Sequence, residues 1–138
     1  MANRVDDVVS ALYDAYNRQD AAAATALYAP QGRHVEIAMG NERTGPDAIR
    51  EGLEGFLTAF PDANWAERAR MVGDGRAAVT YVLTATLQGR FGPFEPKGQP
   101  VELRGVHVIE VGDDGITVVE DYWDAGTFMR QVKAGSDT

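Results

Sequence analysis

The sequence predicts an α+β domain, in which a cone-shaped curved antiparallel sheet wraps around three N-terminal helices and a short C-terminal helix closes the chain. Two observations support this fold class. Apolar residues recur mainly at helical spacing in the first 60 residues and at strand spacing from residue 63 onward. Helices that are segregated along the chain from a run of strands are typical of α+β domains. We expect residues 1–138 to form a single domain, because the length suits one core and no linker interrupts it.

The N-terminal part is expected to hold three helices and one strand. Asp20 can cap a short alanine-rich second helix, which Pro30 should end. The stretch "GRHVEIA" has strand character, and a third helix should begin at Pro46 and end at Pro61. Apolar residues at helical spacing define the inner faces of the first helix (Val5, Val8, Val9, Leu12 and Tyr16) and of the third (Ile49, Leu53, Phe56, Leu57 and Phe60).

The C-terminal part is expected to hold two long hairpins and a helix. The first hairpin turns at Gly73-Asp74-Gly75, and the second, "RGVHVIEVGDDGITVVEDYWD", turns at Asp113-Asp114-Gly115. The Gly/Pro-rich segment "RFGPFEPKGQP" connects the hairpins, and we expect it to form a flap. Asp124 should cap the last helix, which turns Phe128, Met129 and Val132 inward.

The second hairpin carries an imidazole and a carboxylate among aliphatic residues. A three-residue turn would place His107 directly opposite Asp121 on an apolar face, with Cβ atoms roughly 5 Å apart. A two-residue turn would instead pair His107 with Glu120 and move Asp121 to the other face. Burial raises the pKa of a carboxylic acid and an adjacent imidazolium lowers it, so the pair could move a proton near neutral pH. The alternative is a buried Asp–His hydrogen bond that only fixes the register.

Composition excludes several classes of partner and site. The net charge of −8 argues against nucleic acid and anionic membrane surfaces. The absence of cysteine excludes disulfides and thiolate zinc sites. No apolar run approaches the ~20 residues of a membrane span, and the N-terminus lacks the pattern of a signal peptide. We therefore expect a cytoplasmic protein. His34 is interpreted as an exposed or edge histidine, and no metal-ligand spacing is present.

Three segments together resemble a known family. They are "TGPDAIREGLEGFLTAFPDANW", "LQGRFGPFEPKGQPVELRGVHVIEVGDDGITVVEDYWD" and "YWDAGTFMRQV". Nearly the whole chain resembles the SnoaL-like polyketide cyclases of the nuclear transport factor two-like superfamily. The resemblance implies a deep apolar pocket and an intramolecular aldol condensation that needs no metal or cofactor. It also implies that Asp121 is the general acid/base and that His107 lies beside it.

The expected substrate is a small hydrophobic molecule, polycyclic or polyketide-like. Aromatic side chains that the fold could turn inward would stack on it, although about half could be plain core: Tyr16, Phe56, Phe60, Trp65, Tyr81 and Trp123. The second face of the last hairpin is also apolar, which predicts a homodimer or homotetramer.

Two alternatives to a cyclase remain open. One is another enzyme of the same fold. An isomerase would need a tyrosine and a second acid, an epoxide hydrolase would need two aspartates bridged by an arginine, and a cofactor-free hydroxylase is a third option. The other alternative is a small-molecule-binding module without turnover.

Overall fold

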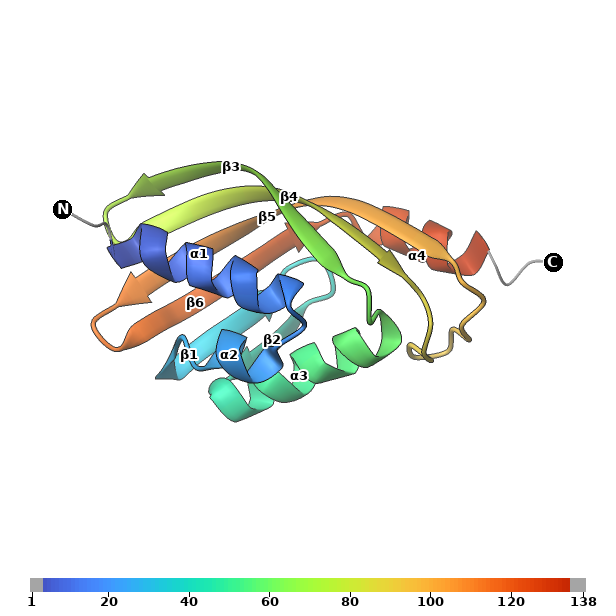
Figure 1. The fold of residues 1–138 in the computed structure, drawn as a ribbon, viewed down its shortest axis with the longest axis horizontal. Helices are drawn as coiled ribbons and strands as arrows, with labels where there is room; N and C mark the ends of the chain where they lie inside the picture. The colour runs from blue at the N-terminus through green and yellow to red at the C-terminus, as the bar shows by residue number, and fades with distance from the viewer. Residues whose placement is uncertain (1–3, 135–138) are drawn as a thin grey trace.

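The computed structural model describes residues 4–134, which form four helices and one curved, unclosed sheet. The sheet has six strands in the order β2-β1-β6-β5-β4-β3. Figure 1 shows the sheet curving around α1, with α2 and α3 along its lower part and α4 at the far end of the long strands. The α+β prediction is confirmed. The elements are α1 (Arg4–Asn17), α2 (Ala21–Thr25), β1 (Tyr28–Glu36), β2 (Asn41–Thr44), α3 (Pro46–Ala59), β3 (Asn64–Gly73), β4 (Arg76–Thr86), β5 (Pro100–Gly112), β6 (Gly115–Trp123) and α4 (Ala125–Ala134).

The second helix is shorter than its alanine-rich sequence predicts. Asp20 caps it as expected, since Oδ1 accepts a hydrogen bond of 2.9 Å from the backbone N–H of Ala23. The helix ends at Thr25 and β1 begins at Tyr28, so the prediction that Pro30 ends the helix is wrong. Pro30 lies inside β1, where the pairing with β6 is irregular and the missing N–H is tolerated.

Strand β1 is an inner strand, not an edge. It pairs antiparallel with β2 and parallel with β6, so the sheet is not purely antiparallel. The parallel register places Glu36 opposite Asp121. Because side chains alternate between the two faces of a strand, His34 and Glu36 lie on the same face of β1. This pairing joins the N-terminal part of the chain to the last hairpin.

The last hairpin reaches the predicted register by a different route. Gly112 pairs with Gly115, so the turn contains only two residues and the expected three-residue turn is wrong. A bulge then places an extra residue, Thr117, on β6. The bulge restores the pairing of His107 with Asp121, which is confirmed.

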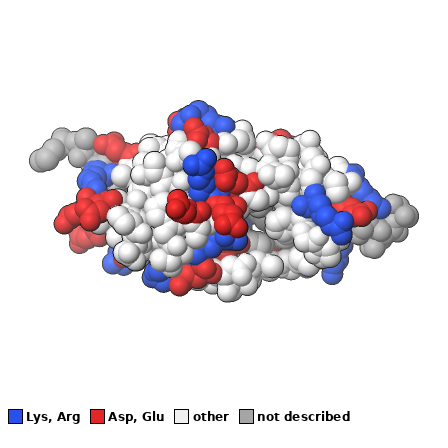
Figure 2. All heavy atoms as spheres, turned by 90° about the horizontal axis from the view of Figure 1, so that it is seen from below, with Lys and Arg blue, Asp and Glu red and all other residues white. Residues whose placement is uncertain are grey.

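The other predicted elements lie close to their expected places. Helix α3 starts at Pro46, and Asp124 accepts a hydrogen bond of 3.1 Å from the backbone N–H of Thr127 at the start of α4. Phe128 and Val132 are buried on α4, and Met129 is partly buried. Residues 4–134 contain no helix that is long and apolar enough to cross a membrane. Acidic and basic side chains are intermixed on the face seen in Figure 2.

Candidate active site

A cavity of about 650 Å³ lies between the helices and the inner face of the sheet. This volume is within the usual range for small-molecule pockets, roughly 300–1,000 Å³. The cavity is lined by seven of the eight residues proposed from the sequence: Tyr16, Phe56, Trp65, Tyr81, His107, Asp121 and Trp123. The eighth, Phe60, is 0 % exposed and stacks behind Phe56 with a ring-centroid distance of 4.8 Å. The structure therefore places Phe60 in the core rather than in the cavity wall.

Asp121 and His107 form a buried pair at the floor of this cavity. Their side chains face each other from β6 and β5, with His107 Nε2 3.3 Å from Asp121 Oδ1. The Tyr81 hydroxyl donates a hydrogen bond of 2.7 Å to the same oxygen. His107 is 1 % exposed and Asp121 7 % exposed. The carboxylate is therefore held in a fixed orientation by two donors.

Tyr13 fixes the other side of the imidazole ring. Its hydroxyl lies 2.6 Å from His107 Nδ1, and burial raises the pKa of Tyr13 well above its ordinary value. Tyr13 therefore keeps its proton and can donate it to Nδ1, and the ring hydrogen on Nε2 then faces Asp121. Tyr13 was not among the residues predicted from the sequence, although it lies three residues before Tyr16, at a spacing that brings both side chains to one face of α1.

The absence of a side chain at Gly105 leaves room for the Tyr81 ring. The two residues pair across β4 and β5, and a Cβ atom on Gly105 would collide with the ring and hydroxyl of Tyr81. The ring stacks on His107 with a centroid distance of 4.6 Å. Any side chain at position 105 would therefore disturb the hydrogen bond from Tyr81 to Asp121.

The charge of Asp121 results from opposing effects. Burial acts to raise its pKa, as the sequence analysis expected for an acid in an apolar pocket. The neighbouring His107, then His34 and the hydrogen bond from Tyr81, act to lower it, and the net shift of the Asp121 pKa is downward. Asp121 is therefore an anion at neutral pH.

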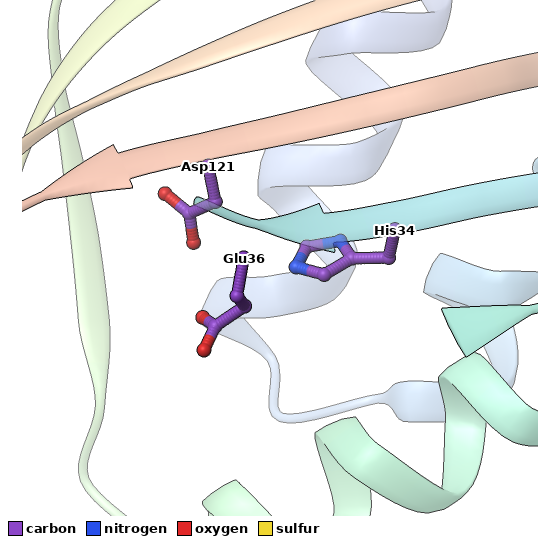
Figure 3. A group of neighbouring side chains, drawn as sticks. All are labelled: His34, Glu36 and Asp121. Atoms are coloured by element: carbon purple, nitrogen blue, oxygen red, sulfur yellow. The ribbon is translucent and has the colours of Figure 1, made fainter. Parts of the chain in front are cut away.

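Two polar residues of β1 complete the site, and neither was among the site residues predicted from the sequence. His34, Glu36 and Asp121 point toward one another from β1 and β6 (Figure 3), and each offers one polar atom within 4.8 Å of the others. The interpretation of His34 as an exposed or edge histidine is wrong. His34 is partly buried because strands flank β1 on both sides, and its Nδ1 lies 3.3 Å from the Tyr28 hydroxyl.

His34 and Glu36 are both shifted toward their neutral forms. Burial is the largest cause for each: it lowers the pKa of His34 to about 4 and raises the pKa of Glu36 to about 7. The nearby charge of Asp121 raises both pKa values, and a hydrogen bond from Trp123 favours the ionised form of Glu36. Near neutral pH the site thus contains an ionised Asp121, a neutral His34 and a Glu36 that is partly protonated.

The cavity mouth differs from the floor. Arg43, Arg90 and Glu51 contribute charged groups, and Met39 and Phe91 contribute apolar ones. Phe91 belongs to the predicted flap, whose short turn is held by paired backbone hydrogen bonds between Phe91 and Phe94. The exposed part of the lining therefore mixes charged and apolar groups, whereas Tyr16, Trp65 and Asp121 are buried.

Comparisons with known proteins agree with this architecture. Residues 6–132 match the family described as SnoaL-like polyketide cyclase. A candidate polyketide cyclase from Xanthomonas campestris pv. campestris has a similar structure, with a TM-score of 0.86, 24% identity, and coverage of 94% of this chain and 96% of that one. No curated protein matches the sequence.

Two further solved structures are similar. AclR, a candidate hydroxylase from Streptomyces galilaeus, has a TM-score of 0.78 at 26% identity, covering 94% of this chain and 81% of its own. TerC, co-crystallised with polyporic acid, has a TM-score of 0.80 at 18% identity, covering 95% of this chain and 99% of its own. Because the family match spans nearly the whole chain, this protein belongs to the SnoaL-like polyketide cyclase family.

Proposed function

We propose that this protein is a cofactor-independent polyketide or polyketide-ester cyclase. It closes a ring by intramolecular aldol condensation of a hydrophobic carbonyl compound. The observation that carries the proposal is the buried His107–Asp121 pair at the floor of a cavity in a chain of this family. TerC, which has the same fold, was co-crystallised with polyporic acid, and this supports a small-molecule ligand here.

The chemistry starts with Asp121. Its carboxylate removes a proton from the carbon between two carbonyl groups, which is already acidic in a polyketide. A modest base suffices there when the substrate is held in a fixed orientation. The N–H of His107 and the Tyr81 hydroxyl keep the carboxylate aimed into the cavity. The aromatic walls, Tyr16, Trp65 and Trp123 among them, bind the flat rings of the substrate by stacking.

The test is product formation. Wild-type protein is incubated with aromatic polyketide esters that carry a second carbonyl within ring-closing reach. Aldol closure gives a hydroxylated product with the mass of the substrate and a new retention time in liquid chromatography, and subsequent dehydration lowers that mass by one water. We expect such a product from wild type and a strongly reduced yield from Asp121→Asn. Equal yields would remove the role of Asp121, and binding without any product would favour a module that only binds.

Allylic isomerisation is a second candidate, favoured by one observation. An isomerase of this fold needs a tyrosine and a second acid, and Tyr16 and Glu36 line the same cavity as Asp121. Incubation with a β,γ-unsaturated ketone separates the two functions, because only an isomerase produces the conjugated ketone, which absorbs in the near ultraviolet.

We further propose that two copies associate through the outer face of the sheet. Val106 and Val108 are only partly buried on this face and Tyr122 is 41% exposed, while the three N-terminal helices lie on the other face. Light scattering after size-exclusion chromatography should give the mass of a dimer or tetramer. Tyr122→Lys should shift the mass toward that of the monomer, and a monomeric wild type would contradict the proposal.

A further inference from the structure

We propose that Glu36 is a second catalytic residue, the general acid that protonates the alkoxide formed when the ring closes. The proposal rests on the cyclase function proposed above and divides the proton transfer between two carboxyl groups. Asp121 takes the proton from carbon, and Glu36 gives a proton to oxygen. No residue of β1 had a catalytic role in the sequence analysis.

The carboxyl groups of Glu36 and Asp121 lie on neighbouring strands and face the same cavity. Glu36 is the β1 residue that pairs with Asp121 in the parallel register, and both side chains line the cavity. Figure 3 shows the two carboxyl groups on the same side of β1 and β6. One polar atom from each of His34, Glu36 and Asp121, the cluster drawn in Figure 3, lies within 4.8 Å of the other two. A substrate carbonyl that projects past Asp121 therefore comes within reach of Glu36.

The surroundings give the two acids opposite preferences. His107 on β5, His34 on β1 and the hydroxyl of Tyr81 on β4 favour the anion of Asp121. Glu36 is affected most by burial and then by the negative charge of Asp121, both of which favour its protonated form. A pair of carboxyl groups whose pKa values are driven apart in this way is the usual arrangement for one base and one acid.

Other groups around Glu36 moderate this preference without reversing it. The Trp123 indole on β6, His107 on β5 and Arg43 on β2 all favour the ionised form of Glu36, and together they leave its pKa at about 7. Tyr16 on α1 and Tyr81 on β4 also interact with the charge of Glu36, but their pKa values are raised far above neutrality, so both stay protonated. Glu36 can therefore both hold and release a proton near neutral pH.

The reaction then balances without a co-reactant. Asp121 removes the proton on carbon, and the enolate carbon forms the new C–C bond with the second carbonyl carbon. The π electrons of that carbonyl move onto its oxygen, and Glu36 donates its proton to this alkoxide to give the hydroxyl group. The site is left with a protonated Asp121 and an ionised Glu36. Transfer of the proton from Asp121 to Glu36, directly or through one water, restores the starting state.

The experiment separates the two proton transfers. Exchange of the acidic α-hydrogens of an aromatic β-ketoester in D2O, followed by proton NMR, requires only the base. Ring closure of the polyketide ester used above requires both base and acid. Both rates are measured for wild type, Glu36→Gln, Glu36→Asp and Asp121→Asn. Glu42→Gln is the matched control, because Glu42 pairs with Val35 and its exposed side chain lies on the opposite face from Glu36.

We expect Glu36→Gln to lower the rate of ring closure by about 10²–10⁴-fold, the usual contribution of a general acid, and to leave α-exchange near the wild-type rate. Glu36→Asp should recover part of the loss, Glu42→Gln should match wild type, and Asp121→Asn should lose both activities. In wild type, kcat/KM for ring closure should fall as the pH rises through about 7, since Glu36 then loses its proton. Glu36→Gln should lack this descending limb.

Several results would overturn the proposal. Wild-type ring closure by Glu36→Gln, with the descending limb intact, would exclude Glu36 as the acid. Loss of exchange and ring closure together in Glu36→Gln would refute the division of labour. Loss of wild-type activity after chelation, with recovery on adding a divalent cation, would mean that the cluster acts through a metal. Failure of the cyclase function itself is distinct, because wild type would then form no ring-closed product.

A direct titration supplements the kinetics without any substrate. Carbon NMR of protein labelled at the glutamate carboxyl carbons should show one signal that titrates at about pH 7, and Glu36→Gln should lack that signal. If all glutamate signals titrate in the ordinary range near 4.3, Glu36 is ionised at neutral pH and cannot be the acid.

Discussion

His107 and Asp121 face each other across β5 and β6, with Nε2 of His107 3.3 Å from Oδ1 of Asp121. The pair lies under a cavity and is supported on both sides by tyrosine hydroxyls, from Tyr13 on the imidazole and from Tyr81 on the carboxylate. This chain of hydrogen bonds sets the orientation of the proposed base. It can be broken at either end without changing the base itself.

Tyr13→Phe removes the donor that faces His107 Nδ1. The buried ring nitrogen then lacks a partner, which should destabilise the protein by about 1–3 kcal/mol. Because the imidazole can then adopt the other tautomer, turnover of the polyketide ester should fall about tenfold, equivalent to ~1.4 kcal/mol in the barrier. Tyr13 acts through His107, so we expect the change in kcat with KM unaltered. Chemical denaturation and steady-state kinetics give the two values, and unchanged kcat would contradict the assigned role.

Gly105→Ala tests the packing of Tyr81. The added Cβ would collide with the Tyr81 ring and hydroxyl, and overpacking of this kind costs about 1–3 kcal/mol. Displacement of the hydroxyl from Asp121 should also lower turnover. Gly55→Ala is the control, since nothing lies within 4 Å of its added Cβ, and in helix α3 the exchange should be neutral or stabilising. Equal melting temperatures for the two variants would refute the clash.

Glu36→Gln should change how stability depends on pH. In the folded protein the pKa of Glu36 is raised from 4.5 to about 7, so the folded state holds this proton more tightly than the unfolded chain. Its contribution is therefore present below pH 4.5 and is lost as the pH rises to about 7. The variant, compared with wild type, should gain stability across this window by at most about 3 kcal/mol, since each pKa unit between the folded and unfolded states corresponds to ~1.4 kcal/mol. Partial exposure of the Glu36 side chain lowers this value. Urea denaturation at several pH values measures the difference, and parallel curves would contradict the shift.

His34→Gln should have the opposite dependence. The pKa of His34 is lowered from 6.5 to about 4, so the unfolded chain takes up this proton first. Stability is fully present above pH 6.5 and is lost as the pH falls toward 4. The variant should lose less stability than wild type over this acidic window, again by at most about 3 kcal/mol. An identical acid transition for both proteins would show that His34 is not shielded from water.

Local patterns predicted much of the fold and part of the site. Residues close together in the sequence were enough to predict the helices α1 and α3, the cap at Asp20 and the alternation of the long strands. The pairing of His107 with Asp121 was also predicted, but from a turn of the wrong length. The actual turn is one residue shorter, and a bulge at Thr117 shifts the register back by one residue, so the same pair results. The spacing of apolar residues contains no signal for such a bulge.

Contacts between distant parts of the chain account for what was missed. His34 and Glu36 join the site because β1 lies parallel to β6, which no local pattern of residues 28–36 indicates. Tyr13 reaches His107 only because α1 crosses the inner face of the sheet. Phe60, proposed for the cavity wall, is covered by Phe56, and helical periodicity cannot tell which of two inward aromatic residues is nearer the cavity.

The central claim, that Asp121 removes a proton from carbon, is tested most directly by exchange of the α-hydrogens of an aromatic β-ketoester in D2O. Wild type and Asp121→Asn are compared at equal concentration, after circular dichroism has shown that both are folded. We predict that the variant exchanges at least about 100-fold more slowly, the lower range for loss of a general base. Exchange at the same rate in both proteins would contradict the account.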